Sequence, residues 1–372
     1  MTTGTFGIAA ARLDIDMSEK IAELEPNKSP LITLTKKMKR VRTVHAGRFE
    51  WMEQELGARW STVNGAHNDA VTSILVTNGS FFRVGDLVKV PRTGETLLVT
   101  AVATNTLTVV RSWGAIVAAA IDNLDPIVII GNLNREGAGI RAILQREPVA
   151  QHNFTQIVRT PVGVTGTLQA TKTYGPKPLS WYRHLGAIEH AVDMERTMLF
   201  GERNIDQSDS QNRRSTGGIL EFCNANGWDV SATTLTEQSF IQWLETVFRF
   251  GNKEKILLAS PRLCTHIDLW AMGKLQTTPK EKTYGVDIKE YVSSHGTLYI
   301  TKHHLLEGAT YGGFGIILDM ENIAYCPLEG RDTRLLTNRQ ANDVDGTVDE
   351  FLTEFGIEVR QPRTHAIIRG VA

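Results

Sequence analysis

Two segments with alternating apolar and polar residues lie far apart in the chain, and they constrain the fold more than any other feature of the sequence. In residues 46–60, Phe49 and Trp51 fall on the same side of an expected strand. In residues 152–167, Phe154 shares one face with three valines further along the strand. We expect these two strands to pair as a long ribbon. Because an isolated two-stranded ribbon is at best marginal in water, this ribbon needs another surface to lie against.

A group of short apolar segments separates the two strands of the expected ribbon. Turn signals, such as Asn78-Gly79, lie between the first four of them. Their spacing predicts a small antiparallel barrel inserted at a loop tip, where insertions are tolerated. The expected strands cover residues 71–76, 82–90, 95–102, 106–111 and 126–130.

The clearest helix of the sequence covers residues 179–201. Apolar residues recur there at helical spacing, Pro178 precedes the segment and Gly201 closes it. At a rise of about 1.5 Å per residue, such a helix is about 34 Å long. A pattern of alternating helices and short strands follows, and two strand-like runs close the sequence.

The charge balance limits the classes of partner. Lys and Arg total 40 and Asp and Glu total 41, a formal net charge of −1, whereas a dedicated nucleic-acid binder is strongly basic. No apolar run approaches the ~18 residues that a membrane helix needs, and residues 1–12 lack the basic and apolar regions of a secretory signal. The cysteines form no CxxC pair, which fits a reducing cytoplasm.

A run of basic residues is the strongest local charge feature. Five of the seven residues from 36 to 42 are Lys or Arg. One interpretation is a solvated or ion-paired surface segment. The other is contact with a polyanion or with an acidic neighbouring subunit. The basic side chains are Lys36, Lys37, Lys39, Arg40 and Arg42.

The sequence contains no recognisable catalytic motif: it has no GxSxG elbow, no P-loop and no HExxH. His184 and His190 lie six residues apart on the expected helix, about 240° around its axis, and so cannot bind one metal ion together. His303 and His304 have no third ligand at a suitable spacing. We therefore expect no catalytic residue, no cofactor and no metal.

Three other candidate sites have structural explanations. The glycines of residues 312–315 enter a strand rather than a helix, so a tight turn is expected there instead of a phosphate cradle. Cys264 lies on an amphipathic helix and is expected to pack. The acidic residues Glu350, Glu354 and Glu358 fall on a strand and are expected to form a solvated face.

The order of these parts resembles that of the major capsid proteins of tailed phages, which have the Hong Kong 97-like fold. Several motifs are similar to those of one subfamily, the capsid proteins of SU-ten-type podophages, and the barrel insertion also looks like phage capsid insertions. The resemblance covers nearly the whole chain. The motifs lie in residues 152–167, 189–195, 199–202 and 214–219 and, for the insertion, in residues 82–86 and 92–95.

The resemblance implies an α+β fold, the Hong Kong 97-like capsid fold, with a small β-barrel inserted in the E-loop. The implied parts are an N-terminal arm (1–45), the outgoing strand of the E-loop (46–66), the inserted β-barrel (67–131), the return strand of the E-loop (132–172), a P-domain with its spine helix (173–230), an A-domain (231–345) and C-terminal P-domain strands (346–372).

The resemblance also implies a structural protein rather than an enzyme. Copies would assemble as hexamers and pentamers into an icosahedral shell around double-stranded DNA, in the host cytoplasm, and remain in the virion. Scaffold, portal and decoration proteins are further implied partners, and no membrane is expected. Arm and ribbon would lie on neighbouring subunits.

Two groups of residues are expected to carry this function. Phe49, Trp51 and Phe154 would be partly exposed in an isolated subunit and covered by a neighbour in the shell. The arm is expected on the inner face of the shell, where the basic residues of 36–42 would face packaged DNA or acidic residues of the next subunit.

Two alternatives stay open. An encapsulin-like nanocompartment shell has the same fold and encloses protein cargo instead of DNA. The other alternative is an α/β enzyme built on residues 231–345, and its weakness is that no catalytic constellation is visible there.

Some capsids of this fold cross-link themselves through an isopeptide bond from an E-loop lysine to an asparagine of a neighbour. Residues 46–66 and 132–170 contain no lysine. The nearest candidates, Lys89 and Lys172, lie inside the expected barrel and at the base of the ribbon. We therefore predict a shell without covalent cross-links.

Overall fold

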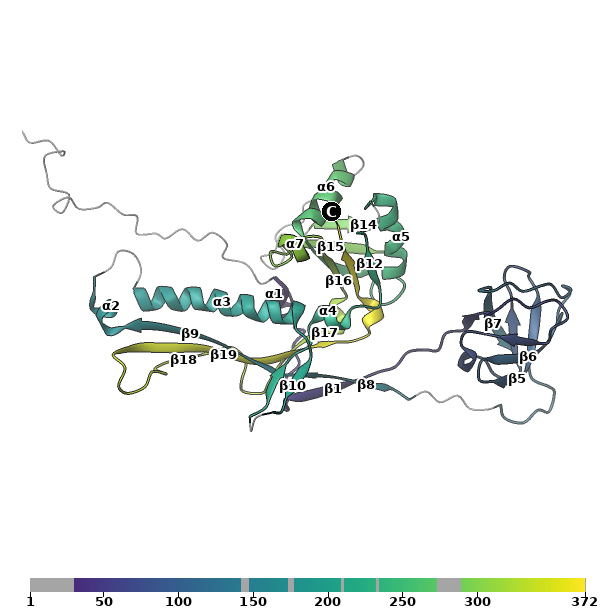
Figure 1. Ribbon diagram of the computed structural model, residues 1–372, viewed down its shortest axis with the longest axis horizontal. Coiled ribbons are helices and arrows are strands. Elements are labelled where there is room, and N and C mark those ends of the chain that lie inside the picture. Colours follow the sequence, from purple (N-terminus) through teal and green to yellow (C-terminus); the bar gives the residue numbers. More distant parts are fainter. Residues whose placement is uncertain are drawn as a thin grey trace, which may run out of the picture. The chain divides into compact units, whose positions relative to one another are not determined.

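The computed structural model describes residues 30–141, 147–172, 177–208, 211–231, 234–272 and 289–371 of the chain, as two compact units (Figure 1). Unit 1 contains the described residues up to Trp51 and from Ala150 onward, and unit 2 contains those within Met52–Val149. Both helices and strands are present, so the protein is mixed α/β. Within the described ranges, no helix is both long enough and apolar enough to cross a membrane.

A six-stranded sheet in unit 1 separates two hydrophobic cores. Its strand order is β12-β20-β16-β13-β15-β14. Along its central strand, Ile256 and Leu258 belong to one core and Leu257 and Ala259 to the other. Burial on both faces explains the continuous apolar run of this strand. The strands are β12 (Gly227–Asp229), β13 (Glu254–Ala259), β14 (Lys289–Val292), β15 (Thr297–Lys302), β16 (Gly315–Leu318) and β20 (Ala366–Arg369).

Helices α5 (Glu237–Val247) and α6 (Pro261–Met272) lie beside this sheet (Figure 1). Phe240 and Leu244 of α5 and Leu263 of α6 are buried in the second of the two cores. Their spacing along each helix places them on one stripe, which is the amphipathic pattern that packs a helix on a sheet.

A second sheet in unit 1 is built around β19 (Gly346–Val359), a strand of 14 residues. Along one edge, β9 (Gln156–Thr165) pairs with it in antiparallel register. Along the other edge, β18 (Arg334–Leu336) and β17 (Ile323–Pro327) pair with successive parts of β19. The sheet therefore joins segments that are almost two hundred residues apart, as in the pair Thr165 and Gly346.

The ribbon expected from the sequence is only partly confirmed. β1 (Arg48–Glu53) pairs with β8 (Val149–Phe154) in a two-stranded sheet, but β9 joins β19 instead of continuing the ribbon. The alternation of β9 is as expected, with three valines buried on one face. Alternation determines which face of a strand is buried but not which strand lies beside it. The sequence therefore could not distinguish β1 from β19 as the partner.

The long helix predicted from the sequence is confirmed as α3 (Pro178–Phe200), which begins at a proline and ends before Gly201. It runs along β9 and β19 (Figure 1). Gly186 permits a close approach, since a Cβ on this residue would lie 2.5 Å from Cγ2 of Val162. At its C-terminal end the helix buries Met194, Met198 and Leu199 in the first core.

The described N-terminal segment packs on its own chain. α1 (Pro30–Lys37) buries Leu31 and Leu34 in the first core. The residues after it lie parallel to β17, where Arg42 N donates to Tyr325 O (2.9 Å) and Val44 N donates to Pro327 O (3.0 Å). Residues 30–44 therefore find cover within their own chain, where a neighbour was expected to supply it, and contact of this segment with a neighbour stays a prediction. Residues 1–29 are outside the described ranges.

Short elements connect these parts of unit 1. β10 and β11 form a hairpin directly after α3, and α4 packs against the C-terminal half of α3. A 3₁₀ turn precedes β17, and another lies between β19 and β20. The short elements are α2 (Gly166–Ala170), β10 (Asn204–Asp206), β11 (Arg213–Ser215), α4 (Ile219–Phe222), α7 (Gly308–Tyr311), η4 (Met320–Asn322) and η5 (Pro362–Thr364).

Unit 2 is an antiparallel sheet with a core of its own. Its strand order is β2-β7-β4-β5-β6-β3, and a bridge between Val63 and Val76 joins the two edge strands, so the sheet closes on itself. The core consists of buried residues between Val63 and Ile127. The elements are β2 (Trp60–Thr62), β3 (Ser73–Leu75), η3 (Gly79–Phe81), β4 (Asp86–Lys89), β5 (Thr96–Ala103), β6 (Thr106–Val110) and β7 (Pro126–Asn132).

The closed sheet begins earlier in the chain than the sequence predicted. Residues 46–66 were expected to form ribbon strand only, but Trp60 of β2 lies opposite Val128 of β7. The compact unit likewise extends beyond the expected 67–131, over Met52–Val149. A strand of three residues has too few alternating positions to be separated from the ribbon by its pattern.

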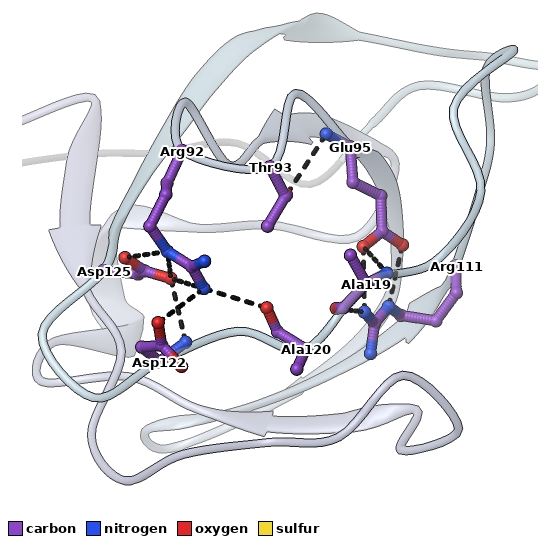
Figure 2. A network of polar contacts seen from close by, with 8 residues as sticks. All are labelled: Arg92, Thr93, Glu95, Arg111, Ala119, Ala120, Asp122 and Asp125. Atoms are coloured by element: carbon purple, nitrogen blue, oxygen red, sulfur yellow. Dashed lines mark hydrogen bonds and ion pairs between the residues drawn. The ribbon is translucent and has the colours of Figure 1, made fainter.

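Two ion pairs, one of them buried, brace the loop between β6 and β7 (Figure 2). Glu95 is fully buried, and Nε and Nη2 of Arg111 each donate to its carboxylate at 2.8 Å. Arg92 donates to Asp125 (2.8 Å) and to the carbonyl of Ala120 (2.9 Å). Burial alone would raise the pKa of Glu95, but the hydrogen bonds from Arg111 and from two backbone N–H groups outweigh it and lower the pKa.

Candidate functional site

Phe49, Trp51 and Phe154, which were expected to be partly exposed in an isolated subunit, are buried in unit 1. Their exposed fractions are 6%, 5% and 8%. Phe49 and Trp51 form one cluster with ring centroids 6.1 Å apart, and the Phe222 ring lies 5.9 Å from that of Trp51. A Cβ on Gly356 of β19 would lie 2.7 Å from the Phe49 ring. The expected exposure is wrong because α4 and the β19 sheet cover these rings within the same chain.

The basic run is largely ion-paired within the chain. Lys36 lies 3.6 Å from Asp332, Arg40 lies 3.6 Å from Glu321, and Arg42 pairs with the fully buried Glu358. Lys37 also has a partner, and Lys39 is exposed with a left-handed backbone (φ 56°). These pairs agree with the interpretation of an ion-paired surface segment. Contact of the run with DNA stays a prediction.

A surface pocket of about 190 Å³ lies where this run meets the C-terminal part of the chain. Arg360, directly after β19, contributes a further cation to it. Nε of Arg40 is buried and has no hydrogen-bond partner among the described residues. The residues that line the pocket are Lys39, Arg40, Val41, Arg42, Glu321, Asn322, Ile323, Ala324 and Arg360.

The acidic residues of β19 are mostly buried, contrary to the expected solvated face. Glu354 and Glu358 are 3% and 0% exposed, and Glu350 is half-buried. Glu354 accepts from Arg214 (2.9 Å) and Arg331 (2.6 Å), which come from β11 and from the loop after β17. The expectation failed because spacing of charges along a strand does not reveal arginines that approach from other segments.

Glu195 of α3 joins three parts of unit 1. Its carboxylate accepts the backbone N–H groups of Leu31 (2.6 Å) and Ile32 (2.9 Å) at the start of α1. The Glu195 carboxylate also lies 2.9 Å from Nε2 of His303, the residue after β15, and both side chains are buried. Nδ1 of His303 accepts from Leu305 N (3.2 Å), so Nε2 carries the proton and donates to Glu195. The arm, the long helix and the strand layer are thus connected at one carboxylate.

The histidines singled out in the sequence have local partners. His190 lies between Thr160 and Thr353, at 2.9 Å and 2.7 Å, and burial lowers its pKa. Among the described residues, no group of three His, Cys, Asp or Glu side chains is placed to hold a metal ion. Burial raises the pKa of the Cys264 thiol, which packs beside the second core.

Two further buried groups lie next to each other at the end of β19. Nζ of Lys255 donates to the carbonyls of Val247 (2.7 Å) and Thr364 (2.6 Å), and burial lowers its pKa to about 8. His365 accepts from Asp319 N through Nδ1 (3.2 Å), while its Nε2 donates to Arg360 O (3.1 Å). Burial lowers the pKa of His365 to about 4. Both groups hold the C-terminal segment to the strand layer.

Unit 2 has a pocket of about 470 Å³ on its surface. Phe81 and Ile129 provide apolar lining, and Arg59, Asp86 and Arg141 provide charge. Arg141 is already paired with Asp86 at 2.6 Å. The pocket therefore offers no cluster of groups with an evident chemical task.

Sequence reasoning missed Glu195, Arg360 and the buried role of Glu354. The signal available for Glu195 was weak: a charged residue between Met194 and Met198 on the buried face of an otherwise amphipathic helix. For Arg360 the sequence holds no signal, because the basic residues that share its pocket, Lys39, Arg40 and Arg42, lie more than three hundred residues earlier in the chain.

Comparison with known proteins identifies the chain. The family model described as SU10 major capsid protein matches residues 1–372. The chain belongs to this family. A curated major capsid protein of Pseudomonas phage PaMx41 is 23% identical over 333 residues, covering 81% of this chain and 78% of that protein. The protein is therefore a major capsid protein of a tailed phage, and membership of a structural family implies that it is not an enzyme.

Solved capsid structures share the fold of this capsid protein. The capsid of cyanophage P-SCSP1u is 9% identical, with a TM-score of 0.53 over 99% of this chain and 98% of that chain. The capsid of a native GTA particle is 9% identical, with a TM-score of 0.52 over 100% of both chains. At such low identity the likeness shows the fold alone. It supports the Hong Kong 97-like capsid fold expected from the sequence, and the family match favours a phage capsid over an encapsulin.

Proposed function

We propose that copies of this capsid protein assemble as hexamers and pentamers into an icosahedral shell that encloses double-stranded DNA in the virion. The single observation that carries the proposal is the match of the capsid family over the whole chain. The fold neighbours support it, since they include capsids that align with nearly all of the chain.

Within this proposal, each region has a counterpart in the capsid fold. The ribbon of β1 and β8 corresponds to the base of the E-loop, and unit 2 is a domain inserted into that loop. α3 corresponds to the spine helix of the P-domain, together with the β19 sheet. The six-stranded sheet with α5 and α6 corresponds to the A-domain.

The ribbon supports assembly through physical reasoning as well. β1 and β8 pair with each other alone among the described strands, and a two-stranded sheet is marginal in water. Met52 at its far end is 69% exposed and Val149 is 60% exposed. A neighbouring subunit that covers this end would remove the apolar area from water.

The partners of the shell follow from the same proposal. We place packaged DNA on the inner face, and expect a portal and scaffold, with or without separate decoration proteins, during assembly in the host cytoplasm. Each of these partners belongs to the proposal and needs its own test.

Expression of the full chain followed by sedimentation and negative-stain imaging tests shell formation directly. We expect closed particles of uniform size. A protein that stays monomeric or dimeric across a range of salt and protein concentration contradicts self-assembly. Nuclease treatment of particles purified from infected cells then distinguishes the contents: protected double-stranded DNA supports the phage capsid, whereas protein cargo without DNA supports the encapsulin alternative.

A further inference from the structure

Arg40, which lines the pocket between the basic run and the end of β19, carries a donor that lacks an acceptor. Nε of Arg40 is buried, yet it makes no hydrogen bond to any described residue. A buried N–H without a partner costs free energy, typically about 1–3 kcal/mol in other proteins. A water or an ion that is not part of the chain is one explanation of such a group, and the pocket beside Arg40 is where one would bind.

We propose that this pocket binds a phosphate group, supplied either by the backbone of a nucleic acid or by free phosphate. Arginine suits this ligand because its planar guanidinium donates two parallel hydrogen bonds to phosphate oxygens. The pocket volume of about 190 Å³ exceeds by several times the ~30 Å³ that one water occupies in the liquid. It therefore has room for a tetrahedral oxyanion.

The charge balance of the pocket favours an anion. Lys39, Arg40, Arg42 and Arg360 line it, against the single carboxylate of Glu321. Glu358 behind the lining pairs with both Arg42 and Arg360, which leaves four cations facing two carboxylates. Glu321 is 61% exposed at its side chain, so it can move toward solvent when a stronger acceptor enters.

The local backbone fixes the approach of the basic side chains. Lys39 has a left-handed backbone (φ 56°), which reverses the chain direction between α1 and the segment on β17. Arg40 O then accepts from Tyr325 N (2.8 Å), and Arg360 N donates to Asn322 O (2.8 Å). The pocket walls are thus held by backbone hydrogen bonds and not by the arginine side chains alone.

The inference deepens the proposed function, on which its nucleic-acid source rests: it assigns DNA contact to a particular pocket that includes Arg360. The sequence prediction assigned it to the whole run of residues 36–42. Lys36 faces Asp332 and the ring of Tyr325 and does not line this pocket. Arg40 and Arg360 are therefore expected to matter more for phosphate binding than Lys36.

The test measures binding of pyrophosphate and of a short fluorescein-labelled DNA duplex to the full chain before assembly, at several salt concentrations. Arg40→Gln should weaken both affinities about five- to tenfold, since a charged hydrogen bond is lost. It should also reduce the salt slope of duplex binding by about one. Glu321→Gln should strengthen both, because it removes the competing carboxylate. Arg339→Gln is the control, an exposed arginine outside the pocket that also faces a carboxylate.

The possible outcomes separate the sources of phosphate and the failure of each proposal. If Arg40→Gln and Arg360→Gln weaken the binding of both pyrophosphate and the duplex, and Arg339→Gln leaves both affinities unchanged, the ligand is a phosphate of the nucleic-acid backbone. Weakening of pyrophosphate alone supports free phosphate. Equal effects of Arg40→Gln and Arg339→Gln, or no gain from Glu321→Gln, overturn the inference. If Arg40→Gln or Arg360→Gln abolishes shell assembly but leaves duplex binding unchanged, the inference is also overturned. The role of these arginines is then contact between subunits. Failure of the wild-type chain to form shells would instead contradict the proposed function and leaves these binding constants measurable.

Discussion

Units 1 and 2 differ in the sequence separation between each buried carboxylate and the arginine that pairs with it. In unit 2, Arg111 and Glu95 are 16 residues apart, and Arg92 and Asp125 are 33 residues apart. In unit 1, Arg42 pairs with Glu358 across 316 residues, and Arg214 pairs with Glu354 across 140. Unit 2 is therefore complete within its own segment, whereas unit 1 needs both ends of its chain.

The difference shows where each unit is vulnerable. A buried carboxylate is tolerated only while its partners remain, because desolvation of an unpaired charge costs several kcal/mol. Unit 2 keeps these partners on neighbouring loops (Figure 2). Unit 1 takes them from the segment after α1, from β11 and from the loop after β17, so changes at distant positions of the sequence converge on β19.

Truncation of the N-terminal segment should have the largest effect, and on unit 1 alone. Deleting residues 1–45 removes Leu31 and Leu34, which are 0% and 1% exposed. Removing one such leucine side chain already costs about 2–5 kcal/mol, so we expect unit 1 to unfold. Calorimetry should then show only the transition of unit 2. Deleting residues 1–29 is the control, since it removes none of the described contacts. A folded unit 1 in the longer deletion would contradict the dependence on α1.

Loss of one arginine should affect unit 2 alone. Arg111→Met leaves Glu95, which is 0% exposed, without its charged partner. We expect the unfolding free energy of unit 2 to fall by about 3–5 kcal/mol, measured by denaturant titration of the full chain. Arg135→Met, an exposed arginine of the same unit, is the control. A shift of the unit 1 transition in Arg111→Met would show that the two units are energetically coupled.

Acid should weaken unit 1 before unit 2. The pKa of His365 lies at about 4 in the folded chain, below its ordinary 6.5, because burial disfavours the charged ring. The unfolded chain thus binds the proton first, so stability is fully present above pH 6.5 and is lost as pH falls toward 4, by up to about 3 kcal/mol. Denaturant midpoints of both units, measured against pH, test this.

The carboxylates of unit 2 provide the contrast in the same titration. The pKa values of Glu95 and Asp125 are lowered, so their contribution persists until pH falls below the ordinary carboxyl range. His365→Gln should flatten the pH dependence of unit 1 between 6.5 and 4. A parallel decline of both units in that window, in the wild-type chain, would rule out His365 as the cause.

Removing one of two partners of a buried carboxylate should have a smaller effect. Arg214→Met leaves Glu354 paired with Arg331, so we expect a loss of only about 1–2 kcal/mol in unit 1. Arg214→Met combined with Arg331→Met should cost more than the sum of the two single changes, because the carboxylate then has no charged partner. Denaturant titration measures both variants against Arg339→Met. Additive effects of the two single changes would contradict a shared site.

We expect no covalent cross-links between the subunits of the shell. β1 and β8 contain no lysine, and Lys89 lies at the end of β4 within the closed sheet of unit 2. Boiling purified particles in detergent should release one band near 41.2 kDa, the mass of the chain. A ladder of multimers that survives reducing agent would contradict this prediction and would point to Lys172, the exposed lysine after α2.

Periodicity predicted the elements whose own residues determine them. α3 has a proline start, a glycine end and a long helical repeat, so its bounds follow from local chemistry. In unit 2, turns separate the strands, and β4, β5 and β6 pair with their neighbours in the sequence, so local patterns suffice for that part of the sheet. The family resemblance came from the order of such elements, and the family match confirms it.

Long-range pairing lay outside what local patterns specify. The partner of β9, the burial of Glu354 and Glu358, and the cover over Phe49 and Trp51 all depend on β19 or on segments that reach it. A buried glutamate and a solvated one have the same spacing in a sequence. Only the arrival of Arg42, Arg214 and similar groups makes the buried position tolerable, and that arrival is a property of the fold.

The pairing of β9 with β19 sets an order of events during synthesis. Unit 2 is complete once residue 149 has left the ribosome. β9 must then wait for about 210 further residues before Val359 completes its partner strand β19, which takes roughly 10–40 s at about 5–20 residues per second. During this interval Leu31, Leu34 and the valines of β9 lack most of their native cover. The nascent chain therefore carries one finished unit and one open apolar surface, and chaperones that bind such surfaces have their opportunity then.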